Sequence, residues 1–347
     1  MELSFRHHPL LLFGIAVSII FAQSAAAQAT AQTNAASDTS AAMLADGPYQ
    51  VSLVSDVILH DAKRKKHLPL NVLYPVASGS GSLPVIIFSH GAGGSKDGYQ
   101  GLTRYWASYG YVVIQPTHVD SIALQRTQGK HPGGLLQNAE EAVSDVQAWQ
   151  DRPRDISFVI DSFGELERKL PHLKNKLDAT RIGVGGHSYG AYTAQAIGGA
   201  TIVLPGKTEA LSLADKRVKA ILMMSPQGSG EMGLTHDSWK NFTLPMMVMT
   251  GSLDRGLKKQ ALGWRKEPFE RAASPEKYYV FIDGATHMSF TGNLAVFGAQ
   301  KQIFNYIKLG SFVFWNAYLK DDPAARAYLK SDSLQKFSNG VVTVDRK

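Results

Sequence analysis

The stretch Arg181-Ile182-Gly183-Val184-Gly185-Gly186-His187-Ser188-Tyr189-Gly190-Ala191 decides the fold of this chain. A strand-like run leads into a Gly-His-Ser-Tyr-Gly turn, and small and apolar residues with helical spacing follow over 191–197. The glycines at 186 and 190 carry no Cβ atom that would collide in a sharp strand-to-helix turn. The pattern therefore predicts a strained turn that presents the Ser188 hydroxyl at the end of a strand.

Short apolar runs of the same kind recur along the chain, as expected of strands buried on both faces of a parallel sheet. These strand-like runs cover 84–89, 111–115, 182–185, 218–224, 246–250 and 278–282, and segments with helical spacing cover 99–109, 138–149, 156–170, 189–197 and 294–319. Strands that alternate with helices predict an α/β fold with a doubly wound, mostly parallel sheet in a single domain. Ligands of such sheets bind outside the carboxyl ends of the strands, so capping loops are expected there.

Basic residues are spread along the chain, which has a formal net charge of +7. The densest run, Lys63-Arg64-Lys65-Lys66, lies between strand-like segments over 51–59 and 70–74 and predicts a solvated hairpin tip. Binding of an anionic cell-surface polymer is the alternative for this run. Aromatic residues do not interleave with basic ones, so the sequence does not support nucleic-acid binding.

The N-terminal residues have the pattern of a secretory signal peptide. Residues 1–27 combine a short head with Arg6, an apolar core over 10–22 and a small-residue end at Ala25-Ala26-Ala27. The apolar core is shorter than the ~20 residues of a membrane span, so no stable membrane anchor is expected after cleavage. Residues 28–48 carry few bulky side chains and are predicted to form a disordered leader. We expect a periplasmic or secreted protein.

The chain contains no cysteine, which excludes disulfides, thiolate metal sites and a cysteine nucleophile. Residues 49–347 are long enough for one large α/β domain with a sizeable core, and no Pro/Gly/Ser-rich linker divides them. We therefore predict a single catalytic domain whose stability comes from its core alone.

Serine is a weak nucleophile until a base removes its proton, so the chain must also supply a histidine and a carboxylate that orients it. His287 follows the strand-like run 278–282 through a Gly-Ala-Thr turn, and we predict that it is the base. The alternative is His236, which lies in a polar segment with no strand directly ahead of it.

Two carboxylates are candidates for orienting this histidine. Asp254 follows the strand-like run 246–250, and it gives the chain order Ser, Asp, His that is typical of a serine on such a turn. Asp283 is the alternative, but it lies a few residues before His287 and would need a chain reversal to face the imidazole. We predict Asp254.

Acyl transfer also needs hydrogen-bond donors for the oxygen that becomes negatively charged in the transition state. One expected donor is the backbone N–H of Tyr189, directly after the serine. The other is expected from the loop Ser89-His90-Gly91-Ala92-Gly93-Gly94, where we choose Ala92. His90 is expected to brace this loop rather than to act as a base.

Four motifs together carry a resemblance to a known family: Phe88-Ser89-His90-Gly91-Ala92-Gly93-Gly94, Tyr109-Gly110-Tyr111-Val112-Val113, Arg152-Pro153-Arg154-Asp155-Ile156-Ser157-Phe158-Val159-Ile160-Asp161 and Gly186-His187-Ser188-Tyr189-Gly190. Over residues 49–319 the chain resembles the dienelactone-hydrolase-like branch of the α/β-hydrolases, which includes bacterial relatives of platelet-activating-factor acetylhydrolase. It also resembles cutinase-like polyester hydrolases, although these commonly carry disulfides. Dienelactone hydrolases proper use a cysteine nucleophile, so lactone specificity is not expected.

The resemblance implies a catalytic triad of Ser188, Asp254 and His287, with oxyanion donors at Ala92 and Tyr189. It implies hydrolysis of carboxylic esters, often with short acyl groups, and needs no metal and no organic cofactor. We therefore expect an exported serine esterase that acts on a small-molecule or lipid-like ester through an acyl-enzyme. The alternatives are an acyltransferase or an amidase or peptidase with the same triad, and a noncatalytic surface-binding protein that kept the fold.

Specificity is expected from three capping segments, 119–136, 227–241 and 255–271. The candidates for lining the substrate pocket are His118, Trp239, Trp264 and Phe290, but for each of them packing in the domain or a place on the surface is the favoured alternative.

Overall fold

The computed structural model describes residue 1 and residues 40–79, 81–256, 258, 260–273, 275–292 and 300–347. Its centre is a nine-stranded sheet. In spatial order the strands are β1 (Val51–Asp61), β2 (Lys66–Pro75), β4 (Val112–Pro116), β3 (Leu83–Ser89), β5 (Leu177–His187), β8 (Val218–Met224), β9 (Met246–Leu253), β10 (Lys277–Thr286) and β11 (Val342–Arg346).

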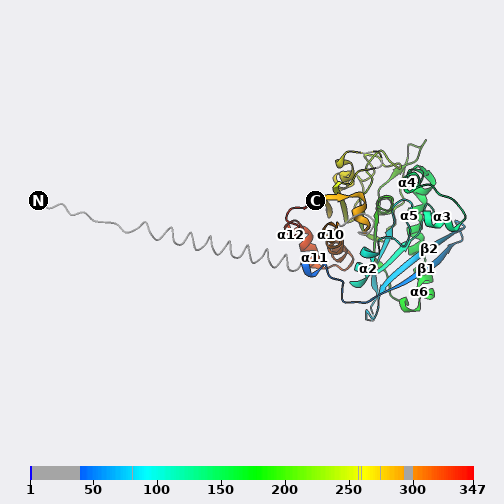
Figure 1. Cartoon of the computed structure of the whole chain (residues 1–347), viewed down its shortest axis with the longest axis horizontal. Helices are drawn as coiled ribbons and strands as arrows, with labels where there is room; N and C mark the ends of the chain where they lie inside the picture. Colours follow the sequence, from blue (N-terminus) through cyan, green and yellow to red (C-terminus); the bar gives the residue numbers. More distant parts are fainter. Residues whose placement is uncertain (2–39, 80, 257, 259, 274, 293–299) are drawn as a thin grey trace.

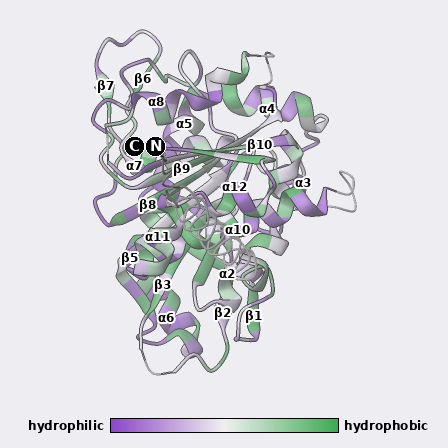
Figure 2. Ribbon diagram, turned by 90° about the vertical axis from the view of Figure 1, so that its left-hand side faces the viewer, coloured by the Kyte–Doolittle hydropathy of each residue, from purple (hydrophilic) through white to green (hydrophobic). Residues whose placement is uncertain are grey.

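The sheet is mostly parallel, as the sequence predicts. Neighbouring strands from β4 through β10 are parallel, whereas β1, β2 and β11 pair antiparallel with their neighbours. The inner strands are buried almost throughout, and the strands in Figure 2 carry much of the hydrophobic colour. The strand order is that of a doubly wound sheet, and the carboxyl ends of the parallel strands lie on a single edge of it.

Helices cover both faces of the sheet and enclose two apolar clusters (Figure 1). One face packs against α2 (Gln100–Ser108), α10 (Lys301–Leu319), α11 (Pro323–Lys330) and α12 (Ser333–Phe337). The other packs against α4 (Leu135–Ser144), α5 (Val146–Asp161), α6 (Phe163–Lys169), α7 (Tyr189–Gly198) and α8 (Glu267–Arg271). This layering matches the predicted α/β class, because each parallel strand must return through a helix on one of the faces.

The remaining elements are short. They are α3 (Ile122–Thr127), η1 (Pro171–Leu173), η2 (Leu262–Lys266), η3 (His287–Thr291) and a two-stranded ladder of β6 (Ile202–Val203) and β7 (Ala210–Leu211). Sequence periodicity did not predict them, because elements of so few residues contain too little of a repeat to be recognised.

The helix boundaries predicted for the region of α4 and α5 were wrong. The helical spacing predicts helices over 138–149 and 156–170, whereas the chain breaks at Asp145 and then continues as one helix through Pro153. Asp145 causes the break, because its side chain accepts the backbone N–H groups of Gln147 at 2.9 Å and Ala148 at 3.2 Å and so caps α5. This matters for the site because α5 carries Arg152 towards the middle of the sheet.

The N-terminal predictions lie mostly outside the described part of the chain. The predicted signal peptide 1–27, apart from Met1, and residues 28–39 of the predicted leader are not described. Residues 40–48 are described, and the carbonyls of Met43, Leu44 and Ala45 accept hydrogen bonds from side chains of α2, α10 and the α2 C-cap. The predicted leader therefore ends too late, since these residues pack on the domain. No helix among the described residues has the length and apolar character needed to cross a membrane.

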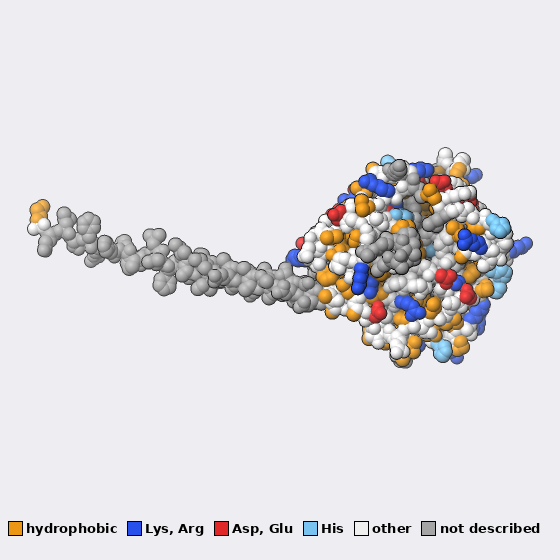
Figure 3. Space-filling view, viewed as in Figure 1, with side chains coloured by type: hydrophobic (Ala, Val, Ile, Leu, Met, Phe, Trp, Pro, Cys, Tyr) orange, Lys and Arg blue, Asp and Glu red, His pale blue; other side chains and the backbone are white. Residues whose placement is uncertain are grey.

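The predicted hairpin is confirmed, but its tip is not simply solvated. β1 and β2 pair antiparallel around residues 62–65. Arg64 and Lys66 turn back towards α5 and donate to Asp155 at 2.7 Å each, and the Asp155 side chain is completely buried. Two cations of the basic run are thus used inside the protein. Over the face shown in Figure 3, the basic side chains are scattered among acidic and apolar ones.

Candidate active site

A cavity of about 530 Å³ lies at the carboxyl ends of the parallel strands, where the fold predicts a ligand site. Its lining brings together segments that are distant in the sequence: Gly91, Ala92, Gly94, Gly98, Tyr99, Leu136, Ala139, Val143, His187, Ser188, Gln227, Glu231, Arg255, Gly256, Trp264, Arg265, His287, Met288 and Thr291. Ser188 and His287 therefore face one cavity.

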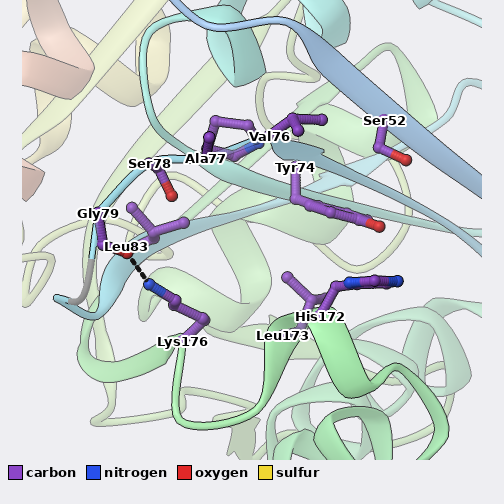
Figure 4. A pocket seen from close by; sticks show the side chains of 11 residues that line it. Ser52, Tyr74, Val76, Ala77, Ser78, Gly79, Leu83, His172, Leu173 and Lys176 are labelled. Carbon is purple, nitrogen blue, oxygen red and sulfur yellow. Dashed lines mark hydrogen bonds between the residues drawn. The ribbon is translucent and has the colours of Figure 1, made fainter.

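A second cavity, of about 430 Å³, lies at the opposite edge of the sheet. Figure 4 shows the side chains that line it. It is bordered by residues at the amino ends of β3 and β5, and Lys176 donates to the Gly79 carbonyl across it. No acidic side chain is among its lining residues, so it offers no carboxylate to orient His172. The first cavity is the candidate active site.

Ser188 occupies the turn that its flanking glycines predict. It follows β5, precedes α7 and has φ 56° and ψ −118°, a strained conformation for a residue with a side chain. A Cβ atom at position 186 would lie 2.2 Å from the Gly190 carbonyl, and a Cβ atom at position 190 would lie 1.9 Å from the Ser89 carbonyl oxygen. The Ser188 N–H donates to Met224 O at 2.9 Å, which fixes the turn to the end of β8.

His287 lies next to Asp254, and not next to the alternative carboxylate. His287 begins η3 directly after β10, and its Nδ1 lies 2.9 Å from Oδ1 of Asp254, directly after β9. Asp283 instead accepts a hydrogen bond from Ser252 at 2.7 Å on the surface. The other histidine candidate, His236, is exposed and does not line the cavity.

The Asp254 carboxylate is buried and has a partner for each oxygen. Oδ1 also lies 3.1 Å from Nε of Arg265, and Oδ2 accepts from the hydroxyls of Ser225 and Thr250, the latter at 2.8 Å. Burial alone would raise the pKa of the Asp254 carboxyl, but the hydrogen bond from His287 and the charge of Arg265 together lower it to about 2. Asp254 is therefore ionised at neutral pH and orients the imidazole.

Arg265 is a site residue that the sequence reasoning missed. It is buried, and it donates to the backbone carbonyls of Ser225 at 2.8 Å and Pro226 at 2.9 Å besides its ion pair with Asp254. It thereby joins the segment after β8 to the segment after β9. No sequence signal distinguishes it, because a lysine or arginine in a polar loop is usually solvated.

The loop after β3 lies beside the serine. A Cβ atom at Gly91 would be 3.5 Å from Cβ of Ser188, and Ala92 lines the cavity. Among hydrogen bonds between described residues, the backbone N–H groups of Ala92 and Tyr189 have no acceptor. These two amides are the predicted oxyanion donors, and they are not used elsewhere in the described structure. Tyr189 is also the first residue of α7, where the helix dipole favours negative charge.

A second chain of hydrogen bonds links this loop to His287. The Tyr99 hydroxyl accepts from Gly91 N–H at 3.1 Å and lies 2.9 Å from Nδ1 of His187, whose Nε2 lies 2.9 Å from the His287 carbonyl oxygen. Burial and the neighbouring His287 hold the pKa of His187 well below its usual range, so its ring is neutral. Since a carbonyl can only accept, Nε2 carries the proton and Nδ1 accepts from Tyr99. Sequence reasoning did not identify Tyr99 as part of the site.

His90 is not part of the cavity lining, in keeping with the expected bracing role. It is buried, its Nδ1 donates to Gly91 O at 2.6 Å, and its Nε2 accepts from the His118 N–H at 3.0 Å. Burial and the charge of Arg152 hold the pKa of His90 well below its usual range. A neutral, fully bonded ring of this kind holds the loop in place.

Each predicted capping segment contributes to the cavity, and the structure separates the four candidate pocket residues. Trp264 lines the cavity, whereas His118, Trp239 and Phe290 do not and are completely buried in the packing of the domain. The Trp239 ring, for example, donates to Oε1 of Gln195 at 2.8 Å. Most of the apolar lining consists of side chains that were not singled out, namely Leu136, Ala139, Val143 and Met288.

No cluster of three or more potential metal ligands occurs among the residues that the structure describes. The cavity brings together a hydroxyl, an imidazole bound to a carboxylate, and backbone amides. These are the components of nucleophilic catalysis on an acyl group.

Two comparisons with known proteins bear on the fold and the chemical class of the chain. Residues 41–154 match the family model of platelet-activating factor acetylhydrolase, isoform II; the matched part contains the loop after β3 and ends before Ser188. Cutinase est1 of Thermobifida alba is 26% identical over 203 residues, which cover 56% of this chain and 60% of that protein. The chain thus matches less than two thirds of the length of this relative. Together with the sheet order, these similarities support the serine esterase branch of the α/β-hydrolases.

Proposed function

We propose that the chain hydrolyses carboxylic esters through an acyl-enzyme on Ser188, a proposal that its similarity to serine esterases of the α/β-hydrolase type supports. One observation carries the proposal: a single cavity joins Ser188, the ring of His287 with Asp254 behind it, and the loop of Ala92. In this proposal Ser188, His287 and Asp254 are the nucleophile, the base and the orienting carboxylate, and the amides of Ala92 and Tyr189 form the oxyanion hole.

The hydrogen bond to Asp254 determines which nitrogen of His287 acts as the base. Nδ1 donates to the carboxylate, so the lone pair is on Nε2. Nε2 takes the proton of the Ser188 hydroxyl while the oxygen forms a bond to the ester carbonyl carbon. The C–O bond of the ester then breaks, and the alcohol leaves with the proton from Nε2. Water attacks the acyl-enzyme by the same route and releases the acid.

The cavity supports a small ester as substrate. A volume of about 530 Å³ is in the range of small-molecule sites and must hold both the acyl and the alcohol parts. Leu136, Ala139, Val143 and Trp264 make much of the lining apolar. We therefore propose esters with short acyl groups as the preferred substrates.

The test is the turnover of p-nitrophenyl esters of increasing acyl length by the purified protein. Ser188→Ala should abolish turnover and labelling by a fluorophosphonate while thermal unfolding stays near that of the wild type. Wild-type turnover in Ser188→Ala would refute the assignment. Lack of labelling of the wild type would instead favour a noncatalytic surface-binding protein.

The alternatives within the chain provide matched controls. His287→Ala should lower kcat by at least about 10³-fold, whereas His236→Ala should leave it unchanged. Asp254→Asn should likewise lower kcat, and Asp283→Asn should not. The reverse result for either pair would move the base or the carboxylate to the other residue. Products formed with added alcohols, and a panel of amides, separate an esterase from an acyltransferase or amidase.

We also propose that the chain is exported and that residues 1–27 are removed. N-terminal sequencing of protein recovered from the periplasm or medium of an expressing bacterium should begin at Gln28. Recovery of the uncleaved chain from the cytoplasm would contradict this.

A further inference from the structure

A buried guanidinium lies behind the loop that carries Ala92. Arg152, on α5, is completely buried. Its Nη1 donates to His90 O at 2.7 Å, and its Nη2 donates to Gly91 O at 3.3 Å. The carbonyl oxygens of the two residues that precede Ala92 therefore both accept hydrogen bonds from one planar guanidinium group.

The same guanidinium also contacts the residue that supplies the other oxyanion donor. Its Cζ lies 4.0 Å from the centre of the Tyr189 ring, a cation–π distance. That ring is buried, and its hydroxyl has no hydrogen-bond partner in the described part of the chain. Arg152 therefore packs on the side chain of the residue whose backbone N–H is the second predicted donor.

Asp120, in the segment after β4, completes the arrangement. Its two oxygens accept from Nε of Arg152 at 3.0 Å and from Nη2 at 2.6 Å, and Oδ2 also accepts from the Gly93 N–H at 3.0 Å. The peptide units on both sides of Ala92 are therefore fixed, by Arg152 before it and by Asp120 after it. Asp120 also neutralises Arg152, which a buried guanidinium requires.

We propose that Arg152 and Asp120 are positioning residues that hold both donors of the oxyanion hole in the geometry of the transition state. This inference rests on the proposed function. The loop contains glycines at 91, 93 and 94, whose backbones have many accessible conformations. Oxyanion donors are effective only when they are oriented before the reaction begins. A planar fork that bonds two consecutive carbonyls supplies that orientation, and a lysine cannot replace it.

The test uses Arg152→Lys, which keeps the charge and loses the fork, and Asp120→Asn, which keeps the shape and loses the charge. Each should lower kcat per active site about 10- to 100-fold, somewhat less than the loss of a whole donor, with KM within about two-fold of the wild type. Active sites are counted by fluorophosphonate titration, so misfolded protein does not contribute. Arg217→Lys is the matched control, because it also removes an arginine fork, one that bonds both oxygens of Asp215 just before β8 and touches neither donor.

An alkylboronic acid provides a readout that a purely structural role would not change. Its tetrahedral adduct with the serine places a negative oxygen in the oxyanion hole. Its Ki should therefore rise in proportion to the fall in kcat/KM for Arg152→Lys and Asp120→Asn, and stay unchanged for Arg217→Lys. A kcat per titrated site within two-fold of the wild type in both Arg152→Lys and Asp120→Asn would overturn the inference and leave the proposed function intact. An absence of ester turnover in the wild type would remove both.

Discussion

Replacement of Gly190 by alanine tests the whole site geometry with one methyl group. The added Cβ would lie 1.9 Å from Ser89 O, 2.6 Å from Ser89 C and 2.9 Å from His90 O. All three atoms belong to the backbone, so no side chain can rotate away. Real Cβ atoms keep at least 3.0 Å from such neighbours, so the turn and the start of the oxyanion loop must separate by about 1 Å.

Two effects of this substitution oppose each other, and their sizes decide the outcome. Position 190 is in α7, where alanine is favoured over glycine by about 1 kcal/mol. The overpacking costs about 1–3 kcal/mol, so we expect a small net loss of stability. A misplacement of about 1 Å between a nucleophile and its oxyanion donors lowers the rate about 100-fold. Activity should therefore fall far more than stability.

The assay is kcat per fluorophosphonate-titrated site with a p-nitrophenyl ester, alongside the midpoint of thermal unfolding. Gly263→Ala is the matched control, because nothing lies within 4 Å of a Cβ atom there. It should match the wild type in both measurements. A Gly190→Ala protein that retains kcat within two-fold would show that the turn and the oxyanion loop do not need their close contact, and the reasoning would fail.

Three further predictions follow from individual contacts. Tyr99→Phe removes the hydroxyl that bonds the Gly91 amide and His187. It should lower the free energy of unfolding in urea by about 1–3 kcal/mol and should also lower kcat. An unchanged kcat would show that the link to His287 is not needed. Gln227→Leu should not destabilise the protein, because the buried Oε1 of Gln227 has no partner among the described residues. Gln195→Leu should lower the free energy of unfolding by about 2 kcal/mol, because it deprives a tryptophan N–H and a backbone carbonyl of their partners. Equal effects of the two substitutions would contradict this. The pKa of Asp254 is about 2 in the folded state against an ordinary 3.8, so its ionisation stabilises the fold by about 2 kcal/mol above pH 4. This contribution is lost as the pH falls to 2, and Asp254→Asn should flatten that part of the pH–stability curve. A curve parallel to that of the wild type would refute the linkage.

Much of the fold could be predicted from the sequence because buried parallel strands are continuous apolar runs. The runs that became β3, β4, β8, β9 and β10 were located to within a few residues. β11 was missed, because a short alternating strand at the C-terminus has a pattern close to that of a loop. The break at Asp145 was missed as well, because it depends on a capping hydrogen bond rather than on periodicity.

By itself the sequence determined the local chemistry of the site: a serine between two glycines after a strand, and an aspartate and a histidine at the ends of later strands. These features are local, since a turn of this kind needs its glycines at fixed positions. Only the tertiary structure decided which carboxylate meets His287, that Arg265 joins this pair, and that Arg152 and Asp120 hold the loop of Ala92. The physical reason is that a buried charge is stable only beside partners that the folded chain brings together, and spacing along the chain does not encode those distances.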